Sequence, residues 1–186
     1  MEDSRIVELF WERSERAISE TDRKYGKYCY SIARNILGDR EDAQEAVNDA
    51  YLGAWESIPP HRPAVLATFL GKITRRLSIN RWRDLSREKR GGGQVPLVLG
   101  ELEECIASGL EVERQVENAR LGQLINAFVD ALPPLEQKVF VCRYWYFDPI
   151  SQIARRFGFS QSKVKSMLYR TRGKLKAHLK KEGVFE

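Results

Sequence analysis

The sequence has few of the residues that build metal sites or disulfides. Its three cysteines, Cys29, Cys105 and Cys142, are far apart and form no CxxC pair, and His61 and His178 are its only histidines. A tetrahedral zinc site therefore lacks suitable ligands, and we expect neither a metal nor a cofactor. An odd number of scattered cysteines is typical of a reducing compartment, which favours the cytoplasm.

Long apolar runs and catalytic motifs are also absent from the sequence. No run reaches the roughly 18 apolar residues of a membrane span, so we expect no direct membrane insertion. The N-terminus, MEDSRIVELFWERSER, is charged too early for a signal peptide. There is no GxxxxGK[ST], GxSxG or HExxH motif, and acidic pairs such as Asp42 with Glu45 are explained more simply as surface charge of a helix. We therefore predict no catalytic residue and no enzyme.

Charge is distributed in blocks along the chain, although the overall net charge is only +5. Residues 69–90 contain eight basic and two acidic side chains, and residues 143–182 contain eleven and two. Residues 39–56 and 91–118 each contain six acidic side chains and one arginine. The basic blocks favour a polyanion as partner, because binding releases its condensed counterions. The acidic blocks must face something else.

Helical periodicity recurs along the chain, and no segment alternates as a strand does, so we predict an all-α fold. Helices are expected over residues 5–21, 25–37, 39–57 and 111–132, and over a basic segment from about residue 66 to 90. Adjacent prolines make residues 58–63 a loop. Three glycines at 91–93 begin a flexible linker. We therefore expect two small helical domains, 1–90 and 114–186, joined by an acidic linker over 91–113.

The strongest pattern is a helix-turn-helix within residues 135–179. Ile150, Ile153 and Phe157 lie on one helical stripe, Gly158 can end that helix in the left-handed conformation, and Ser160 can cap the next. The second helix is basic, as expected of one that enters a DNA major groove. The alternative is a helical hairpin with a solvated basic face. The side chains expected on or near the groove or at phosphates are Gln161, Ser162, Lys163, Lys165, Ser166, Tyr169, Arg170, Arg172, Lys174 and Lys176.

Two other helices allow more than one interpretation. The acidic face opposite the apolar stripe of residues 39–57 is either a solvent-facing surface or a docking face for a basic partner, and the residues alone do not decide. The helix after the proline loop carries Lys72, Arg75, Arg76 and Arg83 on its basic side, which favours nucleic acid. Phe69 shares a stripe with Ile73 and is expected in the core.

Taken in order, these segments resemble the bacterial sigma factors of the extracytoplasmic-function (ECF) type. YGKYCYSIARNILGD resembles the first conserved-region helix of that family, and EDAQEAVNDAYLGAW resembles its helix that grips the clamp of core RNA polymerase. FLGKITRRLSINRWRDLSR is similar to the segment that binds and melts the promoter −10 element. The segment from LPPLEQKVF to YRTRGKL is similar to the domain that reads the −35 element.

The resemblance implies roles for individual residues. The residues implied to face the polymerase clamp are Asp42, Glu45, Asn48, Asp49 and Leu52. The loop over residues 57–64, with His61 and Arg62, is implied to capture a flipped base of the non-template strand, which would drive melting without ATP. The helix after it is implied to hold the −10 DNA through Lys72, Arg75, Arg76, Asn80, Arg81 and Arg83.

We therefore expect an alternative sigma factor that binds core RNA polymerase, reads −35 and −10 elements of double-stranded promoter DNA and melts the latter. The family commonly pairs with an anti-sigma protein, which is a further candidate partner. A rival hypothesis is a self-sufficient dimeric helix-turn-helix regulator, which would bind its operator tightly without polymerase. A third is a nucleic-acid enzyme using carboxylates and magnesium, for which magnesium-dependent cleavage is the test.

Overall fold

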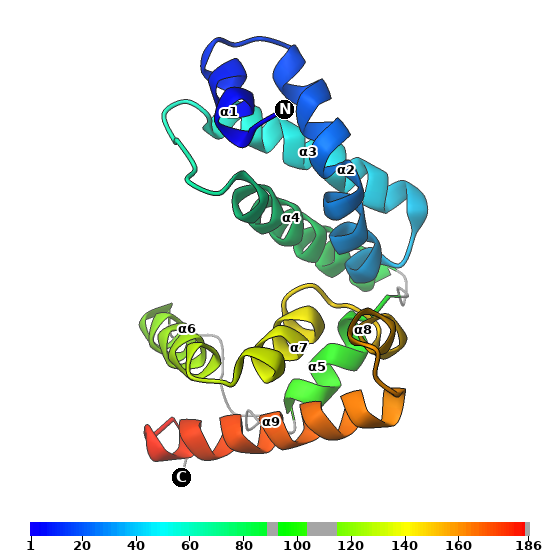
Figure 1. Cartoon of the computed structure of the whole chain (residues 1–186), viewed down its shortest axis with the longest axis vertical. Helices are drawn as coiled ribbons and strands as arrows, with labels where there is room; N and C mark the ends of the chain where they lie inside the picture. The colour runs from blue at the N-terminus through cyan, green and yellow to red at the C-terminus, as the bar shows by residue number, and fades with distance from the viewer. Residues whose placement is uncertain (89–92, 104–114, 185–186) are drawn as a thin grey trace. The chain divides into compact units, whose positions relative to one another are not determined.

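The computed structural model covers the whole chain and describes residues 1–88, 93–103 and 115–184. These residues form helices α1 to α9 and no strand, which confirms the all-α prediction. The chain divides into two compact units, Met1–Val95 and Pro96–Glu186, each with its own core (Figure 1). None of the described helices is long and apolar enough to cross a membrane.

The first unit begins with α1 (Asp3–Trp11) and α2 (Arg16–Leu37). The expectation of one helix over residues 5–21 is wrong, because a turn interrupts the helix between Trp11 and Arg16. In this turn Arg13 has a φ of 53°. The helix expected over residues 25–37 is the second half of α2. It ends at Gly38, whose φ of 74° is the left-handed conformation that the sequence predicted for a C-cap.

The helices α3 (Arg40–Ser57) and α4 (Leu66–Glu88) complete the first unit and pack against α2 and against each other. Ala43, Ala46, Ala50 and Ala54 on α3 are at most 1% exposed, and their small side chains allow neighbouring helices to approach closely. The proline loop between α3 and α4 occurs where the sequence predicted it. Its first residue, Ile58, is fully buried and anchors the loop to the core.

The second unit contains α5 (Val95–Glu103), α6 (Gln115–Asp130), α7 (Pro134–Tyr144), α8 (Ile150–Phe157) and α9 (Gln161–Lys181). Helix α9 packs against α6, α7 and α8. Part of the segment assigned from sequence to a flexible linker is thus helical, since residues 95–103 form α5. The helix expected over 111–132 occurs as α6, and residues 89–92 and 104–114 lie outside the described part.

The helix-turn-helix forms through the caps that the sequence predicted. Gly158 has a φ of 67° and ends α8, with its N–H donating to the carbonyl of Ala154. Ser160 caps α9, because its Oγ accepts a hydrogen bond from the Lys163 N–H at 3.1 Å. Val164, Leu168 and Leu175 are buried, as their spacing predicted. The opposite side of α9 is therefore turned to solvent.

Candidate functional site

The acidic face of α3 is partly occupied by a basic residue of the same unit. Arg81 of α4 donates through Nε and Nη2 to Asp42 Oδ1 at 3.0 and 2.7 Å and also pairs with Glu45. These bonds raise the pKa of the Arg81 guanidinium despite the opposing effect of its burial. Asp42 and Glu45, which were expected to face the polymerase, are thereby joined to Arg81, which was expected at the −10 DNA. Asn48, Asp49 and Leu52 remain exposed on α3.

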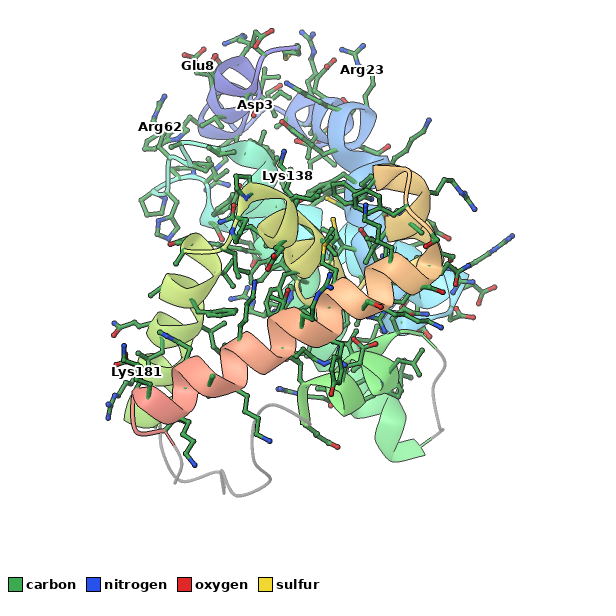
Figure 2. All side chains as sticks on the ribbon, turned by 60° about the horizontal axis from the view of Figure 1, so that its bottom comes forward. Asp3, Glu8, Arg23, Arg62, Lys138 and Lys181 are labelled. Carbon is green, nitrogen blue, oxygen red and sulfur yellow. The ribbon has the colours of Figure 1, made fainter. Side chains whose placement is uncertain are left out.

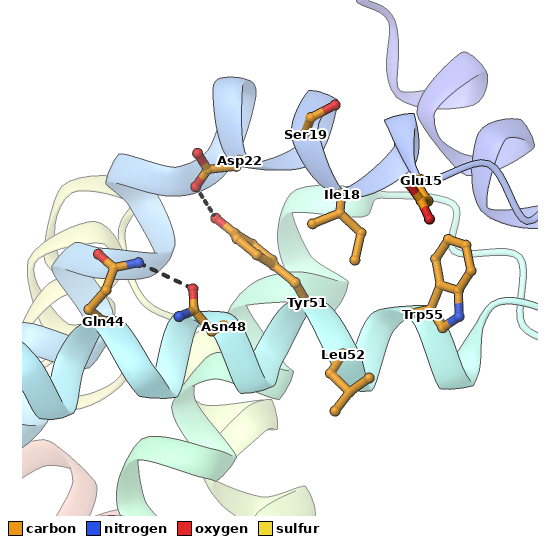
Figure 3. A pocket seen from close by; sticks show the side chains of 9 residues that line it. All are labelled: Glu15, Ile18, Ser19, Asp22, Gln44, Asn48, Tyr51, Leu52 and Trp55. Atoms are coloured by element: carbon orange, nitrogen blue, oxygen red, sulfur yellow. Dashed lines mark hydrogen bonds between the residues drawn. The ribbon is translucent and has the colours of Figure 1, made fainter.

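A groove of about 700 Å³ runs between α2 and α3 beside this face (Figure 3). Asn48 and Leu52 line it together with Trp55 of α3 and Ile18 of α2. Tyr51 closes its floor by donating to Asp22 Oδ1 at 2.8 Å. Sequence reasoning placed this surface on α3 alone and missed the contribution of α2, because helix pairing cannot be read from the period of a single helix.

The basic surface of α4 is exposed along one side of the helix. Lys72, Arg76, Asn80 and Arg83 are exposed and lie three or four residues apart, which places them on one face. Arg75 is half-buried, and desolvation lowers the pKa of its guanidinium. Of the six α4 residues predicted at the −10 DNA, Lys72, Arg76, Asn80 and Arg83 are thus exposed, whereas Arg75 and Arg81 are partly buried.

The loop before α4 presents His61 and Arg62 to solvent. The Arg62 guanidinium lies over the ring of Trp11, 4.9 Å from its centroid. Figure 2 shows Arg62 beside α1, the helix that carries the labelled Asp3 and Glu8. Sequence reasoning assigned no role to Trp11, since α2 and α3 separate it from the loop along the chain.

Nine of the ten α9 side chains predicted to contact DNA are exposed on the outer face of the helix. The seven of these residues that lie in the N-terminal half of α9 are all exposed, and Tyr169 is 69% exposed. Lys163 lies over the Phe159 ring at 3.7 Å, so the turn contributes to the same surface. The exposed residues are Gln161, Ser162, Lys163, Lys165, Ser166, Tyr169 and Arg170. Further along α9, Lys174 pairs with Glu136 at 2.9 Å.

Arg172 is the exception, because its side chain is only 11% exposed. It donates to the Tyr144 hydroxyl at 3.0 Å and lies 3.7 Å from Glu101 of α5. Glu101 also makes two bonds to the guanidinium of Arg143, at 2.6 and 3.1 Å. The side chain of Arg143 is 2% exposed, and the carboxylate of Glu101 compensates its positive charge inside the unit. The expectation that Arg172 lies free at the DNA phosphates is therefore not met in this structure.

Within the described residues, no group of three or more His, Cys, Asp or Glu side chains is placed to hold a metal ion. The side chains exposed at these surfaces include cations, amides and aromatic rings. Such groups bind phosphates and bases.

Comparison with known proteins identifies both units. Residues 22–88 match the family model of Sigma-70 region 2, and residues 122–175 match that of Sigma-70, region 4. The chain is 23% identical over 163 residues to the ECF RNA polymerase sigma factor SigE of Mycolicibacterium smegmatis, which covers 87% of this chain and 61% of that protein. The chain thus spans about three fifths of the length of this curated relative.

A solved structure, that of CnrH in complex with the cytosolic domain of CnrY, is also similar. It is 20% identical, with a TM-score of 0.39, and the match covers 96% of this chain and 97% of that one. The two family models together cover most of the sequence, in the order region 2 and then region 4. The chain therefore belongs to the sigma-70 family of RNA polymerase sigma factors and is of the ECF type.

Proposed function

We propose that this chain is an alternative sigma factor, which binds core RNA polymerase and directs promoter-specific initiation of transcription. The observation that carries the proposal is the presence of regions 2 and 4 in one chain, each with an exposed surface suited to its ligand. The chain would catalyse no reaction of its own, because opening the promoter requires only binding energy. We place its action in the cytoplasm, with an anti-sigma protein as a further candidate partner.

The polymerase would dock on the exposed part of α3, at Asn48, Asp49 and Leu52. Leu52 is 53% exposed beside the α2–α3 groove, and Asp49 supplies negative charge next to it. An apolar anchor with a charged neighbour suits a partner that offers basic and apolar side chains, because burial gives affinity and charge gives orientation. Asp42 and Glu45 would join this interface once they release Arg81.

Promoter DNA would contact both units. The exposed side chains at the start of α9 would enter the major groove of the −35 element, where amides and cations read base edges. The basic face of α4 would follow the phosphates of the −10 region, while the loop over residues 57–64 captures a base that has left the stack. Capture of an unpaired base lowers the free energy of the melted state by the free energy of that binding, which shifts the duplex towards melting.

Run-off transcription tests the proposal directly. Core polymerase, with and without the full chain, is supplied with a library of promoter fragments, and transcripts are mapped. Transcripts that depend on the chain and begin at defined positions are expected, and they reveal the promoter sequence. If none form while the chain alone binds duplex DNA tightly and specifically, it is instead a self-sufficient regulator.

The docking face has its own test in Asp49→Lys. Because Asp49 is exposed and outside the core, the substitution should leave the fold intact and reverse the charge that faces a basic partner. We expect binding to core polymerase to be abolished in a pull-down, with an unchanged circular dichroism spectrum. The matched control is Glu8→Lys, which reverses an exposed acid on another helix, α1. Unchanged core binding by the Asp49 variant would contradict the assigned face.

A further inference from the structure

The pairing of Trp11 with Arg62 joins the first helix of the chain to the loop proposed to capture a flipped base. We propose that the Trp11 indole is a stacking surface for an unpaired DNA base next to that loop. The inference rests on the proposed function, because it assigns a residue to the melting step. Trp11 lies outside residues 22–88, so the match to region 2 does not cover it.

Trp11 is held in a fixed position because both ends of α1 are anchored. At the start of the helix, Asp3 accepts bonds from Lys24 Nζ at 2.6 Å and from the Tyr25 hydroxyl at 2.7 Å. After its end, Arg13 Nη1 donates to the carbonyl of Trp55 at 2.6 Å. A ring presented by such a helix loses little conformational entropy when a base stacks on it.

The side chains of α1 differ in burial, since its apolar residues pack in the core while the Trp11 indole is partly exposed. Ile6 and Phe10 are fully buried, and Phe10 meets the ring of Trp55 edge-on at 6.2 Å between centroids. Trp11, the next residue, is 40% exposed. The indole therefore keeps a large part of its surface open to solvent, unlike the buried side chains of the same helix.

The partner of the indole is a cation from the capture loop itself. Arg62 is exposed and contacts the Trp11 ring with its guanidinium, 4.9 Å from the centroid. Such a contact at an exposed site contributes only about 0.5–1 kcal/mol, so a ligand can replace it. A nucleotide satisfies both groups at once, since its base stacks on the indole and its phosphate takes the guanidinium.

The charge around the ring also suits an anionic ligand. Glu8 and Glu12 are the nearby acids of α1, and Arg5 pairs with them at 3.1 and 2.8 Å. In the turn between α1 and α2, the Arg13 guanidinium lies over the Trp55 ring, 5.3 Å from its centroid. Arg5 thus offsets one of these two negative charges, and Arg62 and Arg13 add two positive charges near the indole and the loop.

The test uses the full chain assembled with core polymerase on a promoter obtained from the run-off library. Trp11→Ala is compared with Trp11→Phe, which keeps a ring for stacking. The yield of melted promoter is read from permanganate reactivity of unpaired thymines. We expect Trp11→Ala to lower the ratio of melted to closed promoter about 5- to 150-fold, the range that corresponds to the loss of one base–aromatic stack, and Trp11→Phe to restore most of it.

Arg62→Ala and Arg23→Ala separate a specific contact from general charge. Both remove one exposed arginine of the same unit, but only Arg62 touches the ring. We expect Arg62→Ala to reduce the melted fraction several-fold and Arg23→Ala to leave it unchanged. Core binding, measured by pull-down, should be the same for all variants. A parallel loss of core binding in Trp11→Ala would overturn the inference and assign Trp11 to the polymerase.

A direct readout is photocrosslinking to single-stranded oligonucleotides that carry 5-iodouracil at successive positions. We expect the free full chain to crosslink through the peptide that contains Trp11 at one or two adjacent positions, and Trp11→Ala to lose this product. If wild-type protein supports no transcription, the proposed function fails, and the crosslink still decides whether Trp11 stacks on a base. Equal melting by wild type and Trp11→Ala, with no crosslink at Trp11, rejects the inference.

Discussion

The ion pair between Glu101 and Arg143 gives a prediction for the stability of the C-terminal unit. Arg143 is almost fully buried, and Glu101 supplies two of its hydrogen bonds and accepts a third from the Tyr144 hydroxyl at 3.0 Å. In Glu101→Ala, the guanidinium keeps its bond from Nη1 to the carbonyl of Asp148 at 3.0 Å but loses both of its bonds to the Glu101 carboxylate. We therefore expect the variant to be destabilised.

The size of the effect follows from burial. Removing one member of a fully buried ion pair costs about 3–5 kcal/mol, because a charge is left without a partner. Glu101 is 24% exposed, so water can replace part of what it supplied. We expect a loss of about 2–3 kcal/mol, which lowers the melting temperature of a unit this size by roughly 10–20 °C.

The measurement is urea denaturation followed by far-ultraviolet circular dichroism, together with hydrogen exchange of the α5 amides. Glu103→Ala is the matched control, since Glu103 lies on the same helix and is exposed. The double variant Glu101→Leu with Arg143→Met should recover much of the stability, because it leaves no uncompensated charge. If Glu101→Ala unfolds at the same urea concentration as Glu103→Ala, the pair does not hold α5 on this unit.

Three further predictions concern helix ends. Gly158→Ala should destabilise the C-terminal unit by about 1–2 kcal/mol in urea titration, because a φ of 67° strains a side chain although nothing lies near the added methyl group. Ser160→Ala should cost about 1 kcal/mol in the same experiment through loss of the cap, and a Ser160→Asp variant that was no more stable than Ser160→Ala would contradict this. Asp39 accepts bonds from the N–H groups of Asp42 and Glu41, which lower the pKa of its carboxyl. Its charged form therefore stabilises α3 above the unfolded pKa of about 3.9, and this stabilisation is lost as pH falls through the lower folded pKa. The difference in free energy of unfolding between wild type and Asp39→Asn, measured by urea titration, should therefore shrink as the pH falls from about 5 to about 2. A difference that stays constant over this range would refute the role of the Asp39 carboxylate.

The sequence predicts the helix ends well wherever a single residue type carries the signal. Gly38 and Gly158 end helices in the left-handed conformation, and Ser160 caps α9, because each of these roles depends on local backbone geometry. The break after α1 was missed for the converse reason. There the left-handed residue is Arg13, a type that gives no such signal, and it is held by its bond to the carbonyl of Trp55.

Contacts made by distant parts of the chain were not predictable in the same way. Arg172 lies at a position where helical periodicity indicates a basic, exposed side chain, but Glu101 and Tyr144 cover it. Glu101 falls in a segment that the neighbouring glycines marked as a linker. A period reports which face of one helix is apolar, and it holds no information about which other element approaches the polar face.

If polymerase and the −10 DNA bind where we propose, the bridge from Arg81 to Asp42 and Glu45 makes these two binding events thermodynamically dependent on each other. A ligand that takes the carboxylates for itself must release the guanidinium, and a ligand that takes the guanidinium must release the carboxylates. By reciprocity, whatever one ligand gains in affinity from the presence of the other is gained equally in the opposite direction. A factor bound to polymerase would thereby hold DNA more tightly than the free factor does, without any change in the positions of its helices.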